Sequence, residues 1–168
     1  LCAGGPGLVS AEATDVSAAG RITPQCLGLY SDGNEAAIQR VIDFCQRHGT
    51  GQIGVQLAHA GRKASTGAPS SGRQAIGPDE ADGWQTVAPS AVPYDKDWNV
   101  PRALDDAGLA EVKGQFVAAA ERAARAGYAL AELHAAHGYL LHQFLSPIAN
   151  QRNDGYGGDL DGRMRFPL

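Results

Sequence analysis

The feature that most constrains this chain is a regular alternation of strand-like and helix-like segments. Residues 8–14, 53–59 and 128–133 are short, largely apolar runs typical of strands, while residues 34–48 and 106–126 carry apolar side chains at helical spacing. Strands that alternate with helices usually form a parallel sheet with right-handed crossovers, so the order predicts an α/β fold. Three strands are too few to close a barrel, which takes ~250 residues, and an open doubly wound sheet fits the same order.

The second strand segment has two distinct faces. Ile53, Val55 and Leu57 fall on one face, and Gln56 falls on the other. In a barrel of parallel strands, the apolar face would pack on helices and Gln56 would point inward. A buried amide without hydrogen-bond partners costs ~2–7 kcal/mol. We therefore expect Gln56 to bond either neighbouring backbone groups or a flat ligand that has both donors and acceptors.

The first strand segment is interrupted by polar residues. Val9, Ala11 and Ala13 alternate with Ser10 and Glu12. A regular strand would place the three apolar side chains together on one face and the two polar ones on the other.

Both helical segments have recognisable ends. Asp32 and Glu35, three residues apart, predict a capping pair at the start of the first helix. Gly49 and Gly127 predict the C-terminal ends of the first and second helices. The apolar positions of the second helix predict the side that faces the core: Val112, Phe116, Val117, Ala120, Ala123 and Ala124.

A long excursion, about residues 60–101, separates the second strand from the second helix. It is rich in Gly, Pro, Ser and Ala, and connections of this length in compact domains are usually functional or disordered. Arg62 and Lys63 open it, immediately after the strand end. By position alone, both are ordinary solvated charges.

The third strand segment runs into the chemically most distinctive stretch of the chain. Two histidines three residues apart are followed by a tyrosine: His134, Ala135, Ala136, His137, Gly138 and Tyr139. Imidazole N–H groups can donate to one oxygen and a phenol can deliver a proton nearby, which suits the reduction of a polarised double bond. Solvated or structurally bonded histidines fit the same spacing. A metal site of His134, His137 and His142 also fits, because histidine is the commonest metal ligand.

Composition narrows the class of protein. Of the 168 residues, 43% are hydrophobic and 19% are charged, which indicates a globular chain. A formal charge of −4 without a basic stripe disfavours nucleic acid and anionic membranes as partners, and no apolar run reaches bilayer length. Cys2, Cys26 and Cys45 match neither a disulfide framework nor a zinc site, so we expect a reducing, cytoplasmic location. No Gly-x-Gly-x-x-Gly opens a helix after a strand, which disfavours a Rossmann unit.

Longer motifs occur in a fixed order along nearly the whole chain. They occupy residues 12–14, 20–23, 54–64, 88–91, 134–139, 152–154 and 156–158. Together they resemble the old yellow enzyme family, most closely the branch that includes bacterial xenobiotic reductases.

The resemblance implies part of a (β/α)₈ TIM barrel that holds FMN. The three strand segments would be strands two to four of the barrel, so residues 1–168 would form a single, incomplete FMN-binding domain. The excursion, about residues 60–101, would follow strand three of the barrel, which is the second strand segment here. The family's first strand, its later strands and the phosphate site near strands seven and eight lie outside this sequence. We therefore expect a piece of a longer protein, and we expect that this piece alone does not hold FMN tightly.

The resemblance also implies roles for individual residues. Ala13 would lie against the flavin and Gln56 would hydrogen-bond its pyrimidine edge. Tyr139 would be the proton donor, and Lys63 matches a family lysine near the site. The residues implied to hold the carbonyl or nitro oxygen of the substrate are His134 and His137, with Ala135 and Ala136 between them.

The implied activity is that of an ene-reductase or NADPH dehydrogenase. Hydride from NADPH or NADH would pass through FMN to the activated C=C bond of an α,β-unsaturated carbonyl or nitro compound. We expect a small-molecule substrate and no metal, and a homo-oligomer is possible for the full-length form. Two alternatives stay open: a metal-dependent barrel hydrolase, and a catalytically incomplete fragment that needs the rest of the barrel.

Overall fold

The computed structural model describes residues 2–168, apart from the side chain of Ser71. Its main sheet contains three parallel strands in the order β1-β2-β5: Leu8–Asp15, Gln52–Ala58 and Leu130–Leu133. Helices α1 (Asp32–His48) and α2 (Asp106–Ala126) connect them. The predicted α/β alternation is confirmed. The shorter elements are η1 (Cys2–Gly4), η2 (Gly61–Lys63), η3 (Pro69–Ser71), β3 (Val87–Ala88), β4 (Arg102–Ala103), α3 (Leu140–Leu145) and α4 (Leu160–Met164).

The two long helices cover one face of the sheet. Ile53, Val55 and Leu57 of β2 are buried in one cluster with Ile38 and Ile42 of α1 and with three alanines of α2, namely Ala119, Ala123 and Ala126. This agrees with the predicted apolar face of β2. Full burial of a large aliphatic side chain is worth ~1.5–3 kcal/mol, so this cluster is the main reason that the helices lie against the sheet. The opposite face carries Gln56, which is only half-buried.

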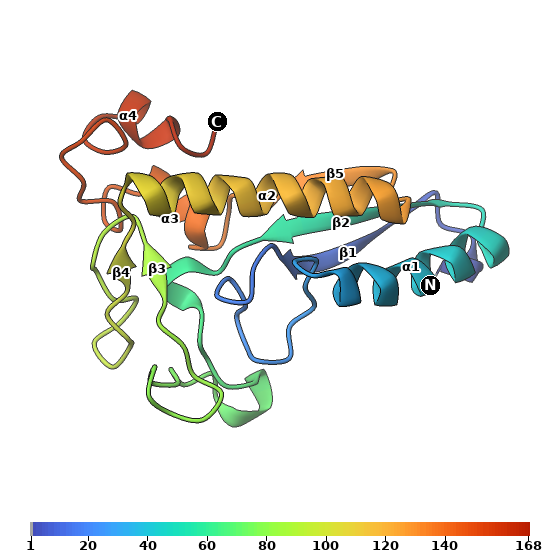
Figure 1. Cartoon of the computed structure of the whole chain (residues 1–168), viewed down its shortest axis with the longest axis horizontal. Coiled ribbons are helices and arrows are strands. Elements are labelled where there is room, and N and C mark those ends of the chain that lie inside the picture. The colour runs from blue at the N-terminus through green and yellow to red at the C-terminus, as the bar shows by residue number, and fades with distance from the viewer. Residues whose placement is uncertain (1) are drawn as a thin grey trace.

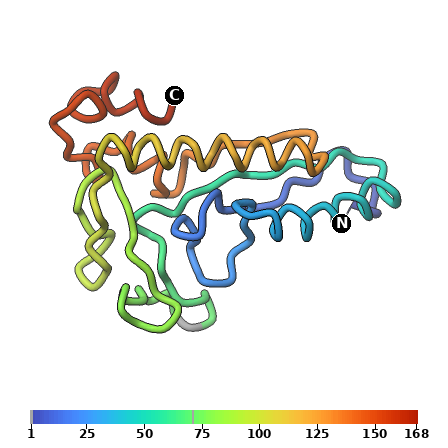
Figure 2. Tube along the Cα trace, viewed as in Figure 1, coloured from blue at the N-terminus to red at the C-terminus, as the bar shows by residue number. Residues whose placement is uncertain are grey.

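The excursion is ordered and gathers at the ends to which the strands point. In Figure 1 the arrows of β1, β2 and β5 point toward the side that holds β3, β4 and α3, and Figure 2 shows the excursion as looping green and yellow-green tube there. Trp84 Nε1 donates to the Ala19 carbonyl oxygen at 2.9 Å. The Arg62 guanidinium donates to the carbonyl oxygens of Val92 and Pro93, so Arg62 fixes the excursion and is not a solvated charge.

A β-bulge changes the expected placement of Ala13. β1 and β2 pair at Ala11 with Val55 and next at Thr14 with Leu57, so β1 contains one extra residue. Thr14 therefore shares the helix-facing side with Leu57, and Ala13 lies on the opposite side. Simple alternation placed Ala13 with Ala11, which is wrong for the observed strand. The bulge puts Ala13 on the same face as Gln56.

The start of α1 also differs from the prediction. Ser31 is the N-cap, and its side chain accepts a hydrogen bond from the Asn34 backbone N–H. The predicted capping pair of Asp32 and Glu35 does not form. Glu35 instead accepts from Arg125 Nε at 2.8 Å and from Arg122 Nη1 at 2.7 Å, which joins α1 to α2.

The ends of α2 agree with the sequence, but its predicted core side does not agree throughout. Gly127 ends the helix in the left-handed conformation, with φ +89°. Val112 and Ala123 are buried as expected, whereas Val117 and Ala124 are exposed. Among residues 2–168, no helix is long and apolar enough to cross a membrane.

Replacing Ser31 tests the observed cap. Ser31→Ala should lower the free energy of unfolding by about 1 kcal/mol, because one N-terminal N–H of α1 loses its acceptor. Asp32→Ala should cost less, because the Asp32 side chain is 97% exposed and only forms an ion pair with Arg122. Urea unfolding followed by circular dichroism measures both. A larger loss of unfolding free energy in Asp32→Ala than in Ser31→Ala would show that Asp32, and not Ser31, caps the helix.

Candidate active site

The predicted catalytic residues meet at the carboxyl end of β5. His134 directly follows β5, and its N–H donates to the Leu57 carbonyl oxygen of β2 at 2.9 Å, which extends the strand pairing by one step. The ring of His134 lies 5.0 Å from that of His137 and 4.8 Å from that of Tyr139, measured between centroids. His134 and Tyr139 are buried, whereas His137 is exposed. One buried and one exposed imidazole thus form the rim of the site.

Hydrogen bonds indicate how the two imidazoles are protonated. The Ala136 N–H donates to His134 Nδ1 at 3.2 Å, so that nitrogen carries no proton. A neutral His134 then holds its proton on Nε2, which lies 3.2 Å from His137 Nδ1 and donates to it. His137 Nδ1 is then the acceptor of this bond. The two nitrogens face each other, so a ligand oxygen would bind here by replacing the bond between them.

The surroundings shift the pKa of His134 and of Tyr139 in useful directions. Burial, and secondarily His137, lowers the pKa of His134, so its ring is neutral at pH 7. Burial raises the pKa of the Tyr139 phenol above its usual 10, which keeps its proton in place at neutral pH. Among the described residues, the phenol oxygen has no hydrogen-bond partner, so its O–H can point to a ligand.

Lys63 lies beside this cluster. Its Nζ donates to the His137 carbonyl oxygen at 3.0 Å and lies 5.1 Å from the centroid of the Tyr139 ring. The Tyr94 ring flanks the same ammonium at 4.8 Å. Burial, with the neighbouring charges of Arg73 and Arg62, lowers the pKa of Lys63. Lys63 therefore lies beside the candidate site, where its hydrogen bond is to the backbone and its other contacts are with aromatic rings.

The turn between the two histidines has an unusual backbone. His137 has φ +54° and Gly138 has φ +74°, so two consecutive residues are left-handed. Glycine adopts this conformation freely, but for histidine it costs ~1–2 kcal/mol. The sequence suggested a turn at Gly138 but gave no signal for His137. Non-glycine residues in this region persist when surrounding contacts hold them, and they cluster at functional sites.

Gln56 and Ala13 lie on the open face of the sheet, below the histidines. The Gln56 amide N–H donates to Oε1 of Glu132, its partner in the β2–β5 register, at 3.0 Å. The sequence analysis did not foresee this bond to a neighbouring side chain. Its carbonyl oxygen and second N–H have no partner among residues 2–168. They fit the N–H and C=O groups along the pyrimidine edge of a flavin, and Ala13 leaves room for a flat ring.

The three-histidine arrangement does not form. His142 Nδ1 accepts from the Gly138 N–H at 2.8 Å, so it bonds the turn and does not join His134 and His137. In the part of the chain that the structure describes, no group of three or more His, Cys, Asp or Glu residues could hold a metal ion.

Asp15 is a residue that the sequence analysis missed. It ends β1 in register with Ala58, is fully buried, and neither carboxyl oxygen has a hydrogen-bond partner among the described residues. Burial raises its pKa to about 8, although Arg21 acts in the opposite direction. The signal that could have identified it is an acidic residue directly after the predicted strand segment, residues 8–14, at the edge where barrel sites form.

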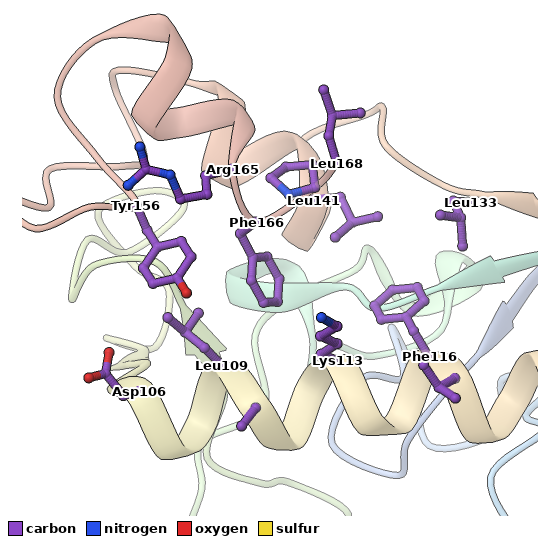
Figure 3. Close-up of a pocket in the computed structure, with 13 residues that line it drawn as sticks. Asp106, Leu109, Lys113, Phe116, Leu133, Leu141, Tyr156, Arg165, Phe166 and Leu168 are labelled. Carbon is purple, nitrogen blue, oxygen red and sulfur yellow. The ribbon is translucent and has the colours of Figure 1, made fainter.

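A separate cavity lies away from these residues. It has a volume of about 640 Å³ and lies on the helix-facing side of β5, as Figure 3 shows. Phe116 of α2 and Phe166 near the C-terminus both point into it. Val117 and Leu133 in its lining are 51% and 53% exposed. Its lining also includes the charged residues Asp106, Lys113 and Arg165, and no predicted site residue contributes to it.

The buried carboxyl of Asp15 predicts a pH dependence of stability. Its pKa is about 8 in the folded chain and 3.8 ordinarily, so the folded state binds the proton more tightly. The stabilisation is complete below pH 3.8 and is lost as the pH rises through 8, with a slope of up to ~1.4 kcal/mol per unit. Asp15→Asn should flatten this fall, measured by urea unfolding from pH 5 to 8. Asp97→Asn, whose side chain is 83% exposed, is the matched control. An unchanged slope in Asp15→Asn would contradict the assignment.

Comparisons with known proteins identify the family and the fold of the chain. The profile of the NADH:flavin oxidoreductase / NADH oxidase family matches residues 2–168. An NADH:flavin oxidoreductase of Gibberella zeae is 49% identical over 98% of this chain. Morphinone reductase in complex with tetrahydroNAD superposes with a TM-score of 0.82, at 32% identity and over 95% of the chain. An old yellow enzyme homologue from Zymomonas mobilis superposes with a TM-score of 0.77, also at 32% identity over 95% of the chain.

The chain is shorter than these proteins. It spans 40% of the Gibberella zeae protein, 45% of the morphinone reductase chain and 44% of the Zymomonas mobilis chain. Its three parallel strands and two helices correspond to part of their TIM barrel, as the sequence predicted. The chain therefore belongs to the NADH:flavin oxidoreductase / NADH oxidase family, with the old yellow enzyme type of barrel.

Proposed function

We propose that residues 1–168 are part of a single FMN-binding barrel domain of an ene-reductase. The reaction would reduce the activated C=C bond of an α,β-unsaturated carbonyl or nitro compound. One observation carries the proposal: two imidazole nitrogens face each other at 3.2 Å at the strand ends, and the Tyr139 ring packs against the buried imidazole.

The open face of the sheet would hold the cofactor. Gln56 would bond the pyrimidine edge of FMN through its carbonyl oxygen and remaining N–H, and Ala13, turned to this face by the bulge, would lie against the ring. Bound FMN would supply the hydride, which it would receive from NADPH or NADH. The protein would supply the binding, the orientation and the proton.

His134 and His137 would hold the oxygen of the substrate. Hydride addition to the β-carbon moves negative charge onto that oxygen, and preorganised N–H donors stabilise this charge by typically ~3–4 kcal/mol each. His134 Nε2 already carries a proton in the observed arrangement. His137 would have to move its proton to Nδ1 when the oxygen enters. The exposure of His137 gives its ring the solvent contact that this exchange requires.

Tyr139 would give its proton to the α-carbon. Its phenol has no hydrogen-bond partner among the described residues and keeps its proton at neutral pH because burial raises its pKa. A general acid must be near the reacting atom and correctly protonated. Ala135 and Ala136 are small and exposed, so they would border the substrate without filling its place.

Further proposals concern the whole protein. The partner is a small electron-poor alkene, the location is the cytoplasm, and the full-length form can be a homo-oligomer. The 168-residue segment lacks the barrel strands that would complete the FMN site, so we propose that it is catalytically incomplete by itself.

Replacing Tyr139 tests the proton donor. Tyr139→Phe in a complete barrel that carries this segment, with the Gibberella zeae relative as the source of the other strands, should slow alkene reduction by ~10²–10⁴-fold. Reduction of the flavin by NADPH should change little, because that step needs no proton from the phenol. Stopped-flow absorbance of the two half-reactions measures this. Equal slowing of both would refute the role.

Flavin titration tests the proposed incompleteness. The segment alone should bind FMN weakly and lose it on gel filtration, since the cradle for the FMN phosphate belongs to other strands. The complete barrel should retain it, and Gln56→Ala in that barrel should weaken retention. A yellow segment with stoichiometric, slowly released flavin would overturn this part of the proposal.

A further inference from the structure

The left-handed turn at His137 and Gly138 needs an explanation that the catalytic assignments do not give. A left-handed histidine is unfavourable by itself, so contacts around the turn must hold it. The turn closes with one hydrogen bond, from the Tyr139 N–H to the Ala136 carbonyl oxygen at 3.1 Å. The His137 carbonyl oxygen and both backbone polar groups of Gly138 bond side chains from outside the turn.

Three side chains fix the backbone of the turn. Lys63 Nζ donates to the His137 carbonyl oxygen at 3.0 Å. His142 Nδ1 accepts from the Gly138 N–H at 2.8 Å, and Gln143 Nε2 donates to the Gly138 carbonyl oxygen at 2.7 Å. His142 and Gln143 both lie on α3, directly after the turn. Three successive backbone groups around the His137–Gly138 peptide are thus each bonded.

Gln143 also ties the turn to the end of β2. It is buried, and its Nε2 donates to the Ala60 carbonyl oxygen at 3.0 Å while its Oε1 accepts from the Arg62 N–H at 3.2 Å. Gly61 makes the space for this amide: a Cβ on Gly61 would lie 2.3 Å from Gln143 Oε1, and φ there is +63°. The residues after β2 are therefore shaped around the Gln143 side chain.

We infer that His142 and Gln143 are positioning residues that hold His137 in its left-handed conformation and so aim its imidazole at His134. Neither residue touches the place between the two rings. Each acts through the backbone of Gly138, whereas Lys63 bonds the carbonyl oxygen of His137. The consequence for catalysis rests on the proposed function, whereas the effect on ring geometry does not.

The geometry explains why this clamp matters for an oxygen ligand. His137 Nδ1 must stay near His134 Nε2, to which it is bonded at 3.2 Å in the free site, so that one oxygen can replace this bond and accept from both rings. Relaxation of φ at His137 to the ordinary right-handed or extended region would swing its ring away. A displacement of ~1 Å in a reacting group can cost 10²-fold in rate.

Imidazole NMR on the 168-residue chain tests the inference without flavin. Histidine side chains labelled with ¹⁵N report which ring nitrogen carries the proton, and Cα and Cβ shifts report the backbone at His137. His142→Ala removes the acceptor for the Gly138 N–H. We expect His137 to show averaged tautomers and a non-left-handed backbone, and amide exchange of Gly138 to rise about fivefold. His142→Asn, whose side-chain oxygen can accept, should restore much of the wild-type pattern.

Controls separate this effect from general destabilisation. His48→Ala removes another exposed histidine, on α1 against Phe44, and should leave the His134 and His137 signals unchanged. Gln143→Met keeps volume but removes both N–H donors, and should disturb His137 at least as much as His142→Ala. If Gln143→Met does not fold, the NMR result for His142→Ala still decides the outcome, because His142 is exposed and its replacement should not prevent folding. Wild-type tautomers and backbone shifts at His137 in His142→Ala would overturn the inference.

Kinetics in a complete, FMN-loaded barrel then separate positioning from the proposed reaction. His142→Ala should lower kcat/KM for the alkene by ~10-fold or more and leave the rate of flavin reduction unchanged. Disturbed NMR signals with unchanged kcat/KM would refute the catalytic consequence but not the clamp. If the wild-type barrel reduces no alkene, the proposed function fails, and the NMR result still judges the clamp.

Discussion

The parallel pairing of β2 and β5 determines where Gln56 and the two histidines lie. Its register joins Gln56 to Glu132 and Leu57 to Leu133, and the bond from the His134 N–H to the Leu57 carbonyl oxygen continues it past the strand end. Because the strands are parallel, both carboxyl ends meet at one edge. Gln56 therefore faces the ligand side one step below the histidines. A shift of one residue would turn these side chains to the helix side.

Local signals in the sequence predicted the parts of the fold that depend on local chemistry. The alternation of Ile53, Val55 and Leu57 identified the buried face of β2, and Gly127 identified the end of α2, because both depend on neighbouring residues only. The motif from His134 to Tyr139 identified residues that do meet in space. Three general rules were enough for these predictions: the periodicity of apolar residues, the conformational freedom of glycine, and the common edge at which parallel strands end.

Features that depend on distant partners were missed. The bulge that turns Ala13 is set by pairing with β2, and Glu35 left its expected capping role because two arginines of α2 reach it. Asp15 shows its burial only when the loop after β1 covers it. The exposure of Val117 follows from the unpaired edge of β5, where the cavity beside α2 lies. Periodicity along a helix cannot indicate which neighbours are present.

The central claim is that His134 and His137 converge on one ligand oxygen. A crystal structure of a complete, FMN-loaded barrel with this segment and an unreactive α,β-unsaturated ketone tests it most directly. The account predicts that the ketone oxygen lies within hydrogen-bond range, about 2.7–3.2 Å, of both His134 Nε2 and His137 Nδ1. A ketone bound with its oxygen elsewhere, while the two imidazoles remain bonded to each other, would contradict it.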